Sequence, residues 1–139
     1  MIVDSVMHRP IVTADEGASV TEGARIMERH RVGCLVITRG DEAVGIVTER
    51  DVVFRIVAAG RSPATTSLRE IMSAPIATVT TEASVDEAAA LMKQLRVKRL
   101  VVMHDGTARG VISVTDIAYA SPETSRAMLD AWVRQRWED

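Results

Sequence analysis

The sequence has 139 residues, 47% of them hydrophobic, with 17 Lys and Arg against 19 Asp and Glu and a formal net charge of -2. This length suits one compact domain or two very small ones, and the apolar fraction is sufficient for a core. The near-neutral charge lacks the single-sign field that gathers nucleic acid or anionic membrane. Aromatic residues make up only 3% of the chain, which argues against the stacking platforms of single-stranded nucleic acid binders.

Neither a membrane span nor a secretory leader is expected. No uninterrupted apolar run approaches the roughly 18 residues of a membrane helix, and the first ten residues lack the basic-then-apolar layout of a signal peptide. The lone Cys34 cannot form an internal disulfide. We therefore expect a soluble, cytoplasmic protein.

An internal repeat organises the chain. Shifting the sequence by 65 residues aligns positions 7–51 with 72–116 without a gap. Identical residues recur throughout, including Met7/Met72, Pro10/Pro75, Ser19/Ser84, Gly45/Gly110 and Asp51/Asp116. Such self-similarity is the signature of a duplicated structural unit.

The first part of each copy predicts a short strand followed by a helix. The extended pieces are 11–14 and 76–79. The motif S-x-x-E follows, beginning at Ser19 and at Ser84, and it predicts a capping box in which the hydroxyl and the Glu side chain bond each other's backbone amides. Apolar residues at helical spacing predict one buried stripe per helix. The stripe residues are Val20, Ala24 and Met27 in the first copy and Val85, Ala89, Met92 and Leu95 in the second.

The second part of each copy predicts a β-hairpin and another helix. Two β-rich runs surround a polar turn in each copy, 34–38 with 43–48 and 100–103 with 109–114. A helix then begins near Thr48 or Ser113 and extends to about Ala59 or Ala120.

Each unit of about sixty residues would bury too little surface alone, so we expect an α/β (α+β) fold. Two β-α-β-β-α repeats would pack through their sheets with pseudo-twofold symmetry. The predicted boundaries are 1–62 for the first repeat, 63–121 for the second and 122–139 for a C-terminal helical extension. Within 123–137 an apolar stripe is formed by Met128, Leu129, Trp132, Val133 and Trp137.

The most informative motif ends each hairpin. It reads G-I-V-T-E-R-D at 45–51 and G-V-I-S-V-T-D at 110–116. A hydroxyl followed three residues later by Asp predicts another helix cap, which stabilises by about 1 kcal/mol. The same helix start is also suited to phosphate, and Asp51 or Asp116 could accept hydrogen bonds from ribose hydroxyls.

These features resemble the cystathionine β-synthase (CBS) domain, whose tandem pair is called a Bateman module. The resemblance rests on the doubled motif, the order of elements, the M-x-x-P preceding each copy and V-K-R-L-V-V at 97–102, and it covers about residues 1–121. It implies two clefts that bind AMP, ADP or ATP, a homodimer and an unknown regulated partner. The motif hydroxyl would contact phosphate, the Asp would hold ribose, and the first strand of each repeat would line the adenine.

The resemblance assigns site residues one by one. The first cleft would use Ile11, Val12, Thr13, Thr48, Arg50 and Asp51, and the second would use Ile76, Ala77, Thr78, Ser113, Thr115 and Asp116. Lys98 and Arg99 match a basic pair that reaches the phosphates, although two solvated charges at a strand edge are an equally good interpretation. The first copy has Gly33 and Cys34 there, so the clefts should differ in phosphate affinity.

Other functions are less well supported by the sequence. His8, His30 and His104 lack metal-ligand spacing. No nucleophile motif, Walker loop or other catalytic constellation occurs, so we expect no enzyme, no catalytic cofactor and no metal. Alternative ligands are S-adenosylmethionine and an adenine dinucleotide. The alternative role is an assembly protein with vestigial clefts that contacts a partner through the helix at 123–137. Nucleic acid binding through Arg25, Arg29 and Arg31 is the other alternative, and a solvated helix face is the simpler interpretation of these residues.

Overall fold

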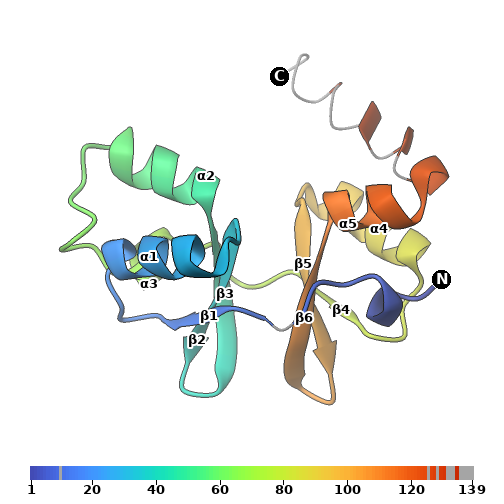
Figure 1. The fold of residues 1–139 in the computed structure, drawn as a ribbon, viewed down its shortest axis with the longest axis horizontal. Coiled ribbons are helices and arrows are strands. Elements are labelled where there is room, and N and C mark those ends of the chain that lie inside the picture. The colour runs from blue at the N-terminus through green and yellow to red at the C-terminus, as the bar shows by residue number, and fades with distance from the viewer. Residues whose placement is uncertain (10, 125, 128, 131–133, 135–139) are drawn as a thin grey trace. The chain divides into compact units, whose positions relative to one another are not determined.

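The computed structural model describes residues 1–9, 11–124, 126, 127, 129, 130 and 134. It contains two three-stranded sheets with the orders β1-β2-β3 and β4-β5-β6, each accompanied by helices (Figure 1). The predicted α/β repeat architecture is therefore confirmed. Helical backbone follows Ser121 at residues 122–124. Met128, Trp132, Val133 and Trp137, on which the predicted C-terminal stripe depends, lie outside the described residues.

The helices and strands follow the same order in both repeats. The chain from 11 to 76 forms β1 (Thr13–Asp15), α1 (Val20–His30), β2 (Cys34–Arg39), β3 (Glu42–Thr48), α2 (Glu49–Val52), a π-helix η2 (Val53–Val57) and α3 (Leu68–Ile71). The remainder forms the 3-10 helix η1 (Val3–Ser5), β4 (Thr78–Thr80), α4 (Val85–Leu95), β5 (Arg99–His104), β6 (Thr107–Ser113) and α5 (Val114–Ala120). Two short helices, η1 and α3, were not predicted.

Each sheet combines one parallel and one antiparallel pairing. β1 runs parallel to β2 with Thr13 opposite Val36, and β4 runs parallel to β5 with Thr78 opposite Val101. The pairs β2–β3 and β5–β6 are antiparallel hairpins. Both predicted hairpins are confirmed, and β1 and β4 are left as edge strands.

The two compact units differ from the two sequence repeats, because each unit contains the segment that precedes the other repeat's first strand. The first unit comprises Ile11–Ile76, and the second comprises residues 1–10 together with the chain from Ala77 onward. The exchanged segments form isolated β-bridges that repeat with the 65-residue shift. Ile2 bridges Ser84 as Ser67 bridges Ser19, and His8 bridges Val111 as Ser73 bridges Ile46. Thus the segment preceding each repeat's first strand packs on the other repeat's sheet.

The motif glycines permit this packing. A Cβ at Gly110 would lie 2.5 Å from the carbonyl oxygen of His8. A Cβ at Gly45 would lie 2.5 Å from the Met72 sulfur and 3.0 Å from the Ser73 carbonyl oxygen. Real Cβ atoms do not approach so closely, so a side chain at either position would force its neighbours to shift.

The core of each unit lies between its sheet and its first long helix. On α1 the buried residues are Val20, Gly23 and Met27, so the predicted inclusion of Ala24 was wrong. The reason is α3: Leu68 packs on Gly23, where an added Cβ would lie 2.8 Å from a Leu68 methyl carbon. On α4, Leu95 was also wrongly placed in the stripe, since its side chain is exposed.

The predicted caps of α1 and α4 are confirmed for the hydroxyl. Ser19 accepts a hydrogen bond from the Glu22 amide and Ser84 accepts one from the Glu87 amide. The reciprocal carboxylate bond is found instead at Ser67/Glu70 and at the two hairpin motifs. A full capping box therefore marks α3 and the helix that leaves each hairpin.

Candidate functional site

Each hairpin motif forms a complete capping box at the junction of strand and helix. In the first unit, Asp51 Oδ2 accepts hydrogen bonds from the Thr48 amide at 2.8 Å and from the Thr48 hydroxyl at 3.1 Å. That hydroxyl in turn accepts one from the Asp51 amide at 3.3 Å. In the second unit the same three bonds join Ser113 and Asp116 at 2.9, 3.0 and 3.2 Å. The structural interpretation of the motif is confirmed.

The cap uses only the Oδ2 atom of each aspartate. The Oδ1 atom faces a basic side chain. Asp51 Oδ1 lies 3.7 Å from Arg55 Nε, and Asp116 Oδ1 lies 3.8 Å from His8 Nδ1. The two aspartate side chains are 14% and 19% exposed. Each motif thus presents a largely buried, oriented carboxylate oxygen that can accept a further hydrogen bond, as a hydroxyl group of a ligand would provide.

Sequence reasoning missed the basic neighbours of these carboxylates. Arg55 lies four residues after Asp51, a spacing at which opposite charges on a helix face each other, so the sequence carried a signal for it. Its Nη1 also donates to the carbonyl oxygen of Ile71 at 2.8 Å. His8 carries no such signal, because only the segment exchange brings residues 1–10 to the sheet that contains Ser113.

Backbone amides of the helix starts are partly occupied. The Glu49 amide donates to the Gly33 carbonyl and the Val114 amide donates to the Lys98 carbonyl, each at 3.0 Å. Neither these bonds nor the caps use the amides of Arg50 and Thr115. The Arg50 guanidinium lies over the Phe54 ring, 5.0 Å from its centroid, so its side chain is held against the helix that follows.

Both motif hydroxyls lie on the sheet face away from the core of their own unit. Leu35 and Val47 are register partners and belong to the first core cluster. Because side chains alternate along a strand, the next pair, Cys34 and Thr48, faces the opposite side. In the second unit, this places Arg99 beside Ser113. The basic residue expected near phosphate is therefore a cross-strand neighbour of a motif hydroxyl.

The segments expected to line the base are edge strands. The Val12 carbonyl accepts from the Val36 amide at 3.0 Å, and the Ala77 carbonyl accepts from the Val101 amide at 2.9 Å. Backbone groups alternate along a parallel ladder, so the amide and carbonyl of Thr13 and of Thr78 point away from their sheets. The central strands β2 and β5 separate these segments from the motif hydroxyls.

The predicted residues of the first cleft all lie in one compact unit, whereas those of the second cleft are divided between the two units. Ile11, Val12, Thr13, Thr48, Arg50 and Asp51 all belong to the first unit, and Ala77, Thr78, Lys98, Arg99, Ser113, Thr115 and Asp116 belong to the second. Ile76, assigned to the second cleft, is the last residue of the first unit.

Within the described residues, no three His, Cys, Asp or Glu side chains gather as a metal site. In that same part of the chain, no helix combines the length and apolar character needed to cross a bilayer.

Comparison with known families identifies the fold. The family model described as CBS domain matches the chain twice, at residues 3–58 and 68–123. The chain belongs to the CBS domain family. Each match spans one hairpin and the motif that ends it, so the protein is a tandem CBS pair.

Its relatives include bacterial and archaeal proteins. An uncharacterized protein, MK0525, from Methanopyrus kandleri is 35% identical over 122 residues, 86% of this chain and 62% of that protein. Hypoxic response protein 1 of Mycobacterium tuberculosis is 30% identical over 119 residues, 85% of this chain and 83% of the relative. Neither name denotes an enzyme. The chain spans less than two thirds of the Methanopyrus protein.

Solved structures share the fold. The hexameric CBS-CP12 protein from bloom-forming cyanobacteria has a TM-score of 0.81 and 32% identity, covering 87% of this chain and 71% of that one. The structure of Hypoxic Response Protein I with two coordinated zinc ions has a TM-score of 0.75 and 28% identity, covering 86% and 98%.

Proposed function

We propose that this CBS pair is a regulatory module, and not an enzyme, that binds AMP, ADP or ATP reversibly and acts on a partner protein. One observation carries the proposal: both motifs orient a largely buried carboxylate whose Oδ1 atom the cap does not use. A ribose offers two neighbouring hydroxyl donors suited to such an acceptor. Family membership supports the adenine nucleotide as the ligand class.

The rest of each site complements this role. The outward-directed backbone of Thr13 and of Thr78 provides a donor and an acceptor for the edge of a base. Phosphate would be held near the motif hydroxyl, where Arg99 in the second unit adds a planar cationic donor suited to oxyanions. In this proposal the ribose hydroxyls replace Arg55 and His8 as the neighbours of the two Oδ1 atoms.

A regulatory response requires a difference in affinity between two arrangements of the module. A nucleotide can shift such an equilibrium only by as much as its affinities for the two states differ. No catalytic constellation is needed for this action, and the names of the relatives given above include no enzyme.

The test is calorimetric titration of AMP and ATP into the wild-type chain and into the double variant Asp51→Ala/Asp116→Ala. Hydrogen bonds to a charged group contribute roughly 1.5–3 kcal/mol, so we expect each site to lose at least about tenfold in affinity. Unchanged affinity in the folded double variant would overturn the proposal.

Loss of a helix cap is the confounding effect, and the chain offers a matched control. Ser67 and Glu70 form the same reciprocal box on α3, outside both motifs. Glu70→Ala should lower stability comparably, yet leave nucleotide affinity unchanged. Circular dichroism would show that each variant is folded before titration.

The identity of the ligand can be screened by thermal shift with AMP, ADP, ATP, NAD and S-adenosylmethionine. A ligand that binds only the folded state raises the unfolding temperature by mass action. The pair Lys98 and Arg99 favours phosphate over a sulfonium, so we expect the adenosine phosphates to give larger shifts than S-adenosylmethionine.

Self-association is the second part of the proposal. The similar cyanobacterial CBS-CP12 protein is hexameric, and the helix η2 presents Val53, Phe54 and Val57 with 50%, 55% and 71% of their surface exposed. We propose that a second copy of the chain covers this face as a homodimer. Light scattering should give a dimer for the wild type and a monomer for Phe54→Glu/Val57→Glu; a monomeric wild type would contradict it.

A further inference from the structure

Each motif aspartate is connected to one of the exchanged segments. In the second unit, Asp116 Oδ1 lies 3.8 Å from His8 Nδ1. The backbone of His8 is held on the same sheet, because its amide donates to the Val111 carbonyl at 2.8 Å and its carbonyl accepts from the Val111 amide at 3.0 Å. We call the contact between the His8 ring and Asp116 the His8 tether. It joins the second motif to a segment that continues into the first unit at Ile11.

In the first unit an arginine makes the connection. Arg55 Nε lies 3.7 Å from Asp51 Oδ1. Its Nη1 atom donates to the Ile71 carbonyl at 2.8 Å and to the Met72 carbonyl at 3.4 Å. We call these contacts the Arg55 tether. It joins the first motif to the other exchanged segment, which continues into the second unit at Ala77.

The two tethers use different positions of the repeat. The 65-residue shift equates Arg55 with Ala120 and His8 with Ser73, so the repeats do not share these residues. A connection from the motif aspartate to the exchanged segment is nevertheless present in both units. Its recurrence with different side chains indicates a role for the connection itself.

The tethers run crosswise between the two proposed nucleotide sites. The segment that contains His8 continues into 11–13, the residues proposed to line the base in the first site. The segment that contains Met72 continues into 76–78, which have this role in the second site. The aspartate of each site therefore contacts the chain that supplies the base-lining strand of the other site.

The base-lining strands have few bonds of their own. Strands β1 and β4 contain three residues each and lie at the edges of their sheets. The Val36 amide donates to the Val12 carbonyl, and the Val101 amide donates to the Ala77 carbonyl. With one neighbouring strand each, β1 and β4 depend on the chain that enters them for their order.

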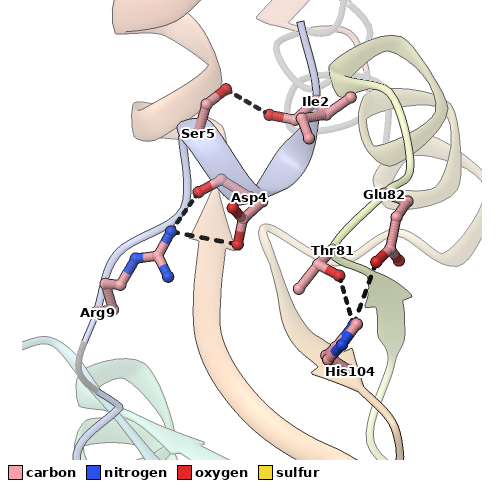
Figure 2. Close-up of polar contacts among 7 residues, drawn as sticks. All are labelled: Ile2, Asp4, Ser5, Arg9, Thr81, Glu82 and His104. Atoms are coloured by element: carbon pink, nitrogen blue, oxygen red, sulfur yellow. Dashed lines mark hydrogen bonds and ion pairs between the residues drawn. The ribbon is translucent and has the colours of Figure 1, made fainter.

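The segment that contains His8 also borders open space. A cleft of about 300 Å³ beside His104 is lined by Ile2, Asp4 and Arg9 of the segment and by Thr81, Glu82 and His104 of the second repeat. Figure 2 shows Arg9 bonded to Asp4, and His104 bonded to Thr81 and Glu82. The cleft gives the segment room to shift when the His8 tether is lost.

We propose that the two tethers couple the nucleotide sites, so that a nucleotide bound at one site lowers the affinity of the other. This inference rests on the proposed function, because the ribose hydroxyls displace each tether from Oδ1. A displaced tether leaves the exchanged segment less ordered, and the next ligand must order the base-lining strand that follows it. When one ligand loosens what another must order, binding is negatively cooperative. The coupling factor is the same in both directions.

The test measures AMP affinity at the first site with the second site blocked or filled. Arg99→Glu places a negative charge beside Ser113 and blocks the second site, yet leaves both tethers in place. In this background His8→Ala should lower first-site affinity about two- to fivefold, as expected for a partly exposed ion pair. Where Arg99 is retained and the second site fills first, His8→Ala should have no effect, because the nucleotide has already displaced His8.

NMR titration follows the first site through amide signals near Thr48. Imidazole acquires its charge between pH 5 and 8, so all titrations are run at pH 6. His30→Ala, a matched change at the exposed end of α1, should leave the affinity unchanged in both backgrounds. An equal effect of His8→Ala with the second site blocked and filled, or no effect in either case, would overturn the coupling.

Amide hydrogen exchange tests the tethers without any ligand. His8→Ala should speed exchange of the Val36 amide, and Arg55→Met should speed exchange of the Val101 amide, each about two- to fivefold. Arg29→Met on α1 is the control and should change neither. Unchanged exchange in both tether variants would contradict the inference even if AMP binds. Absence of AMP binding at both sites would instead overturn the proposed function, and the coupling with it.

Discussion

Arg99 lies directly opposite Ser113 in the antiparallel pair of β5 and β6, and Cys34 holds the same place opposite Thr48 in β2 and β3. Directly opposed residues share a face and have Cβ atoms about 5 Å apart. The two motifs are therefore alike in their caps and unlike in the charge beside the hydroxyl.

The first prediction concerns this difference. Arg99→Cys should lower AMP affinity in the second unit by about tenfold, because a cationic donor to phosphate is lost. Cys34→Arg should raise affinity in the first unit, because it introduces the missing charge. Calorimetry on both variants measures the effects.

The exchange of Arg99 and Cys34 in one double variant is the control for this prediction. It keeps the net charge and should transfer the tighter site from the second unit to the first, detected by amide shifts near Thr48 and Ser113. If both single variants bind AMP as the wild type does, Arg99 has no role in phosphate binding.

The second prediction concerns the motif glycines. Gly110→Ala would bring a Cβ within 2.5 Å of the His8 carbonyl oxygen, so the segment around His8 must shift on the sheet. Overpacking of this kind costs about 1–3 kcal/mol. Urea unfolding should show a destabilisation in that range.

Gly45→Ala meets the flexible Met72 side chain first, which allows a suppressor. The double variant Gly45→Ala/Met72→Ala should lose less stability than the sum of the losses in the two single variants. Strict additivity in this cycle would show that the Met72 contact is not the source of the strain.

The duplicated sequence predicted much of the fold because each element was specified locally. Hydroxyl caps, β-rich runs and a polar turn act over a few residues, and two copies in phase exclude coincidence. The segment exchange could not be predicted this way, because an internal alignment equates residues 1–10 with 66–75 without saying which sheet either contacts. The buried face of α1 was misjudged at Ala24 for the same reason: the helix turns Gly23 inward to receive Leu68.

The candidate site was predicted to the level of the motif and no further. The cap joining Thr48 to Asp51 follows from spacing alone. The neighbours of the second carboxylate oxygen depend on tertiary structure, since His8 reaches Asp116 from the exchanged segment. The cleft beside His104 likewise combines Ile2, Asp4 and Arg9 of the exchanged segment with residues of the second repeat.

The third prediction is a loss of stability in acid. The Arg39 guanidinium, by hydrogen bonding, lowers the pKa of Glu16 below its ordinary value of 4.5. Hydrogen bonds from Ser67 and Arg61 lower the pKa of Glu70 in the same way. A lowered folded-state pKa gives stability that is present above about pH 4.5 and lost as the pH falls through the lowered value. The unfolding temperature should therefore fall below that pH.

Glu16→Gln tests the assignment, because it removes the group that titrates. The variant should be less stable than the wild type at pH 7, and the difference should shrink as the pH is lowered toward 3. Glu28→Gln, on an exposed face of α1 without an ion pair among the described residues, is the matched control. An equal difference at both pH values would contradict the linkage.

The fourth prediction concerns the ends of the two long helices. Arg31 and Arg96 adopt left-handed backbone conformations with φ of 54° and 56°. The following amides, of Val32 and Val97, return to the carbonyls of Met27 and Met92 at 3.0 Å, the long bond of a Schellman motif. A side chain in this conformation costs about 1–2 kcal/mol.

Glycine removes that cost but increases the entropy of the unfolded chain, which offsets about 0.4–1 kcal/mol. We therefore expect Arg31→Gly and Arg96→Gly each to stabilise by roughly 0.5–1 kcal/mol, since the two effects differ by that amount. Arg29→Gly, inside α1, should instead destabilise by about 1 kcal/mol. Denaturant unfolding of the three variants measures these signs, and destabilisation by Arg31→Gly as large as that by Arg29→Gly would show that the left-handed backbone at Arg31 carries no strain.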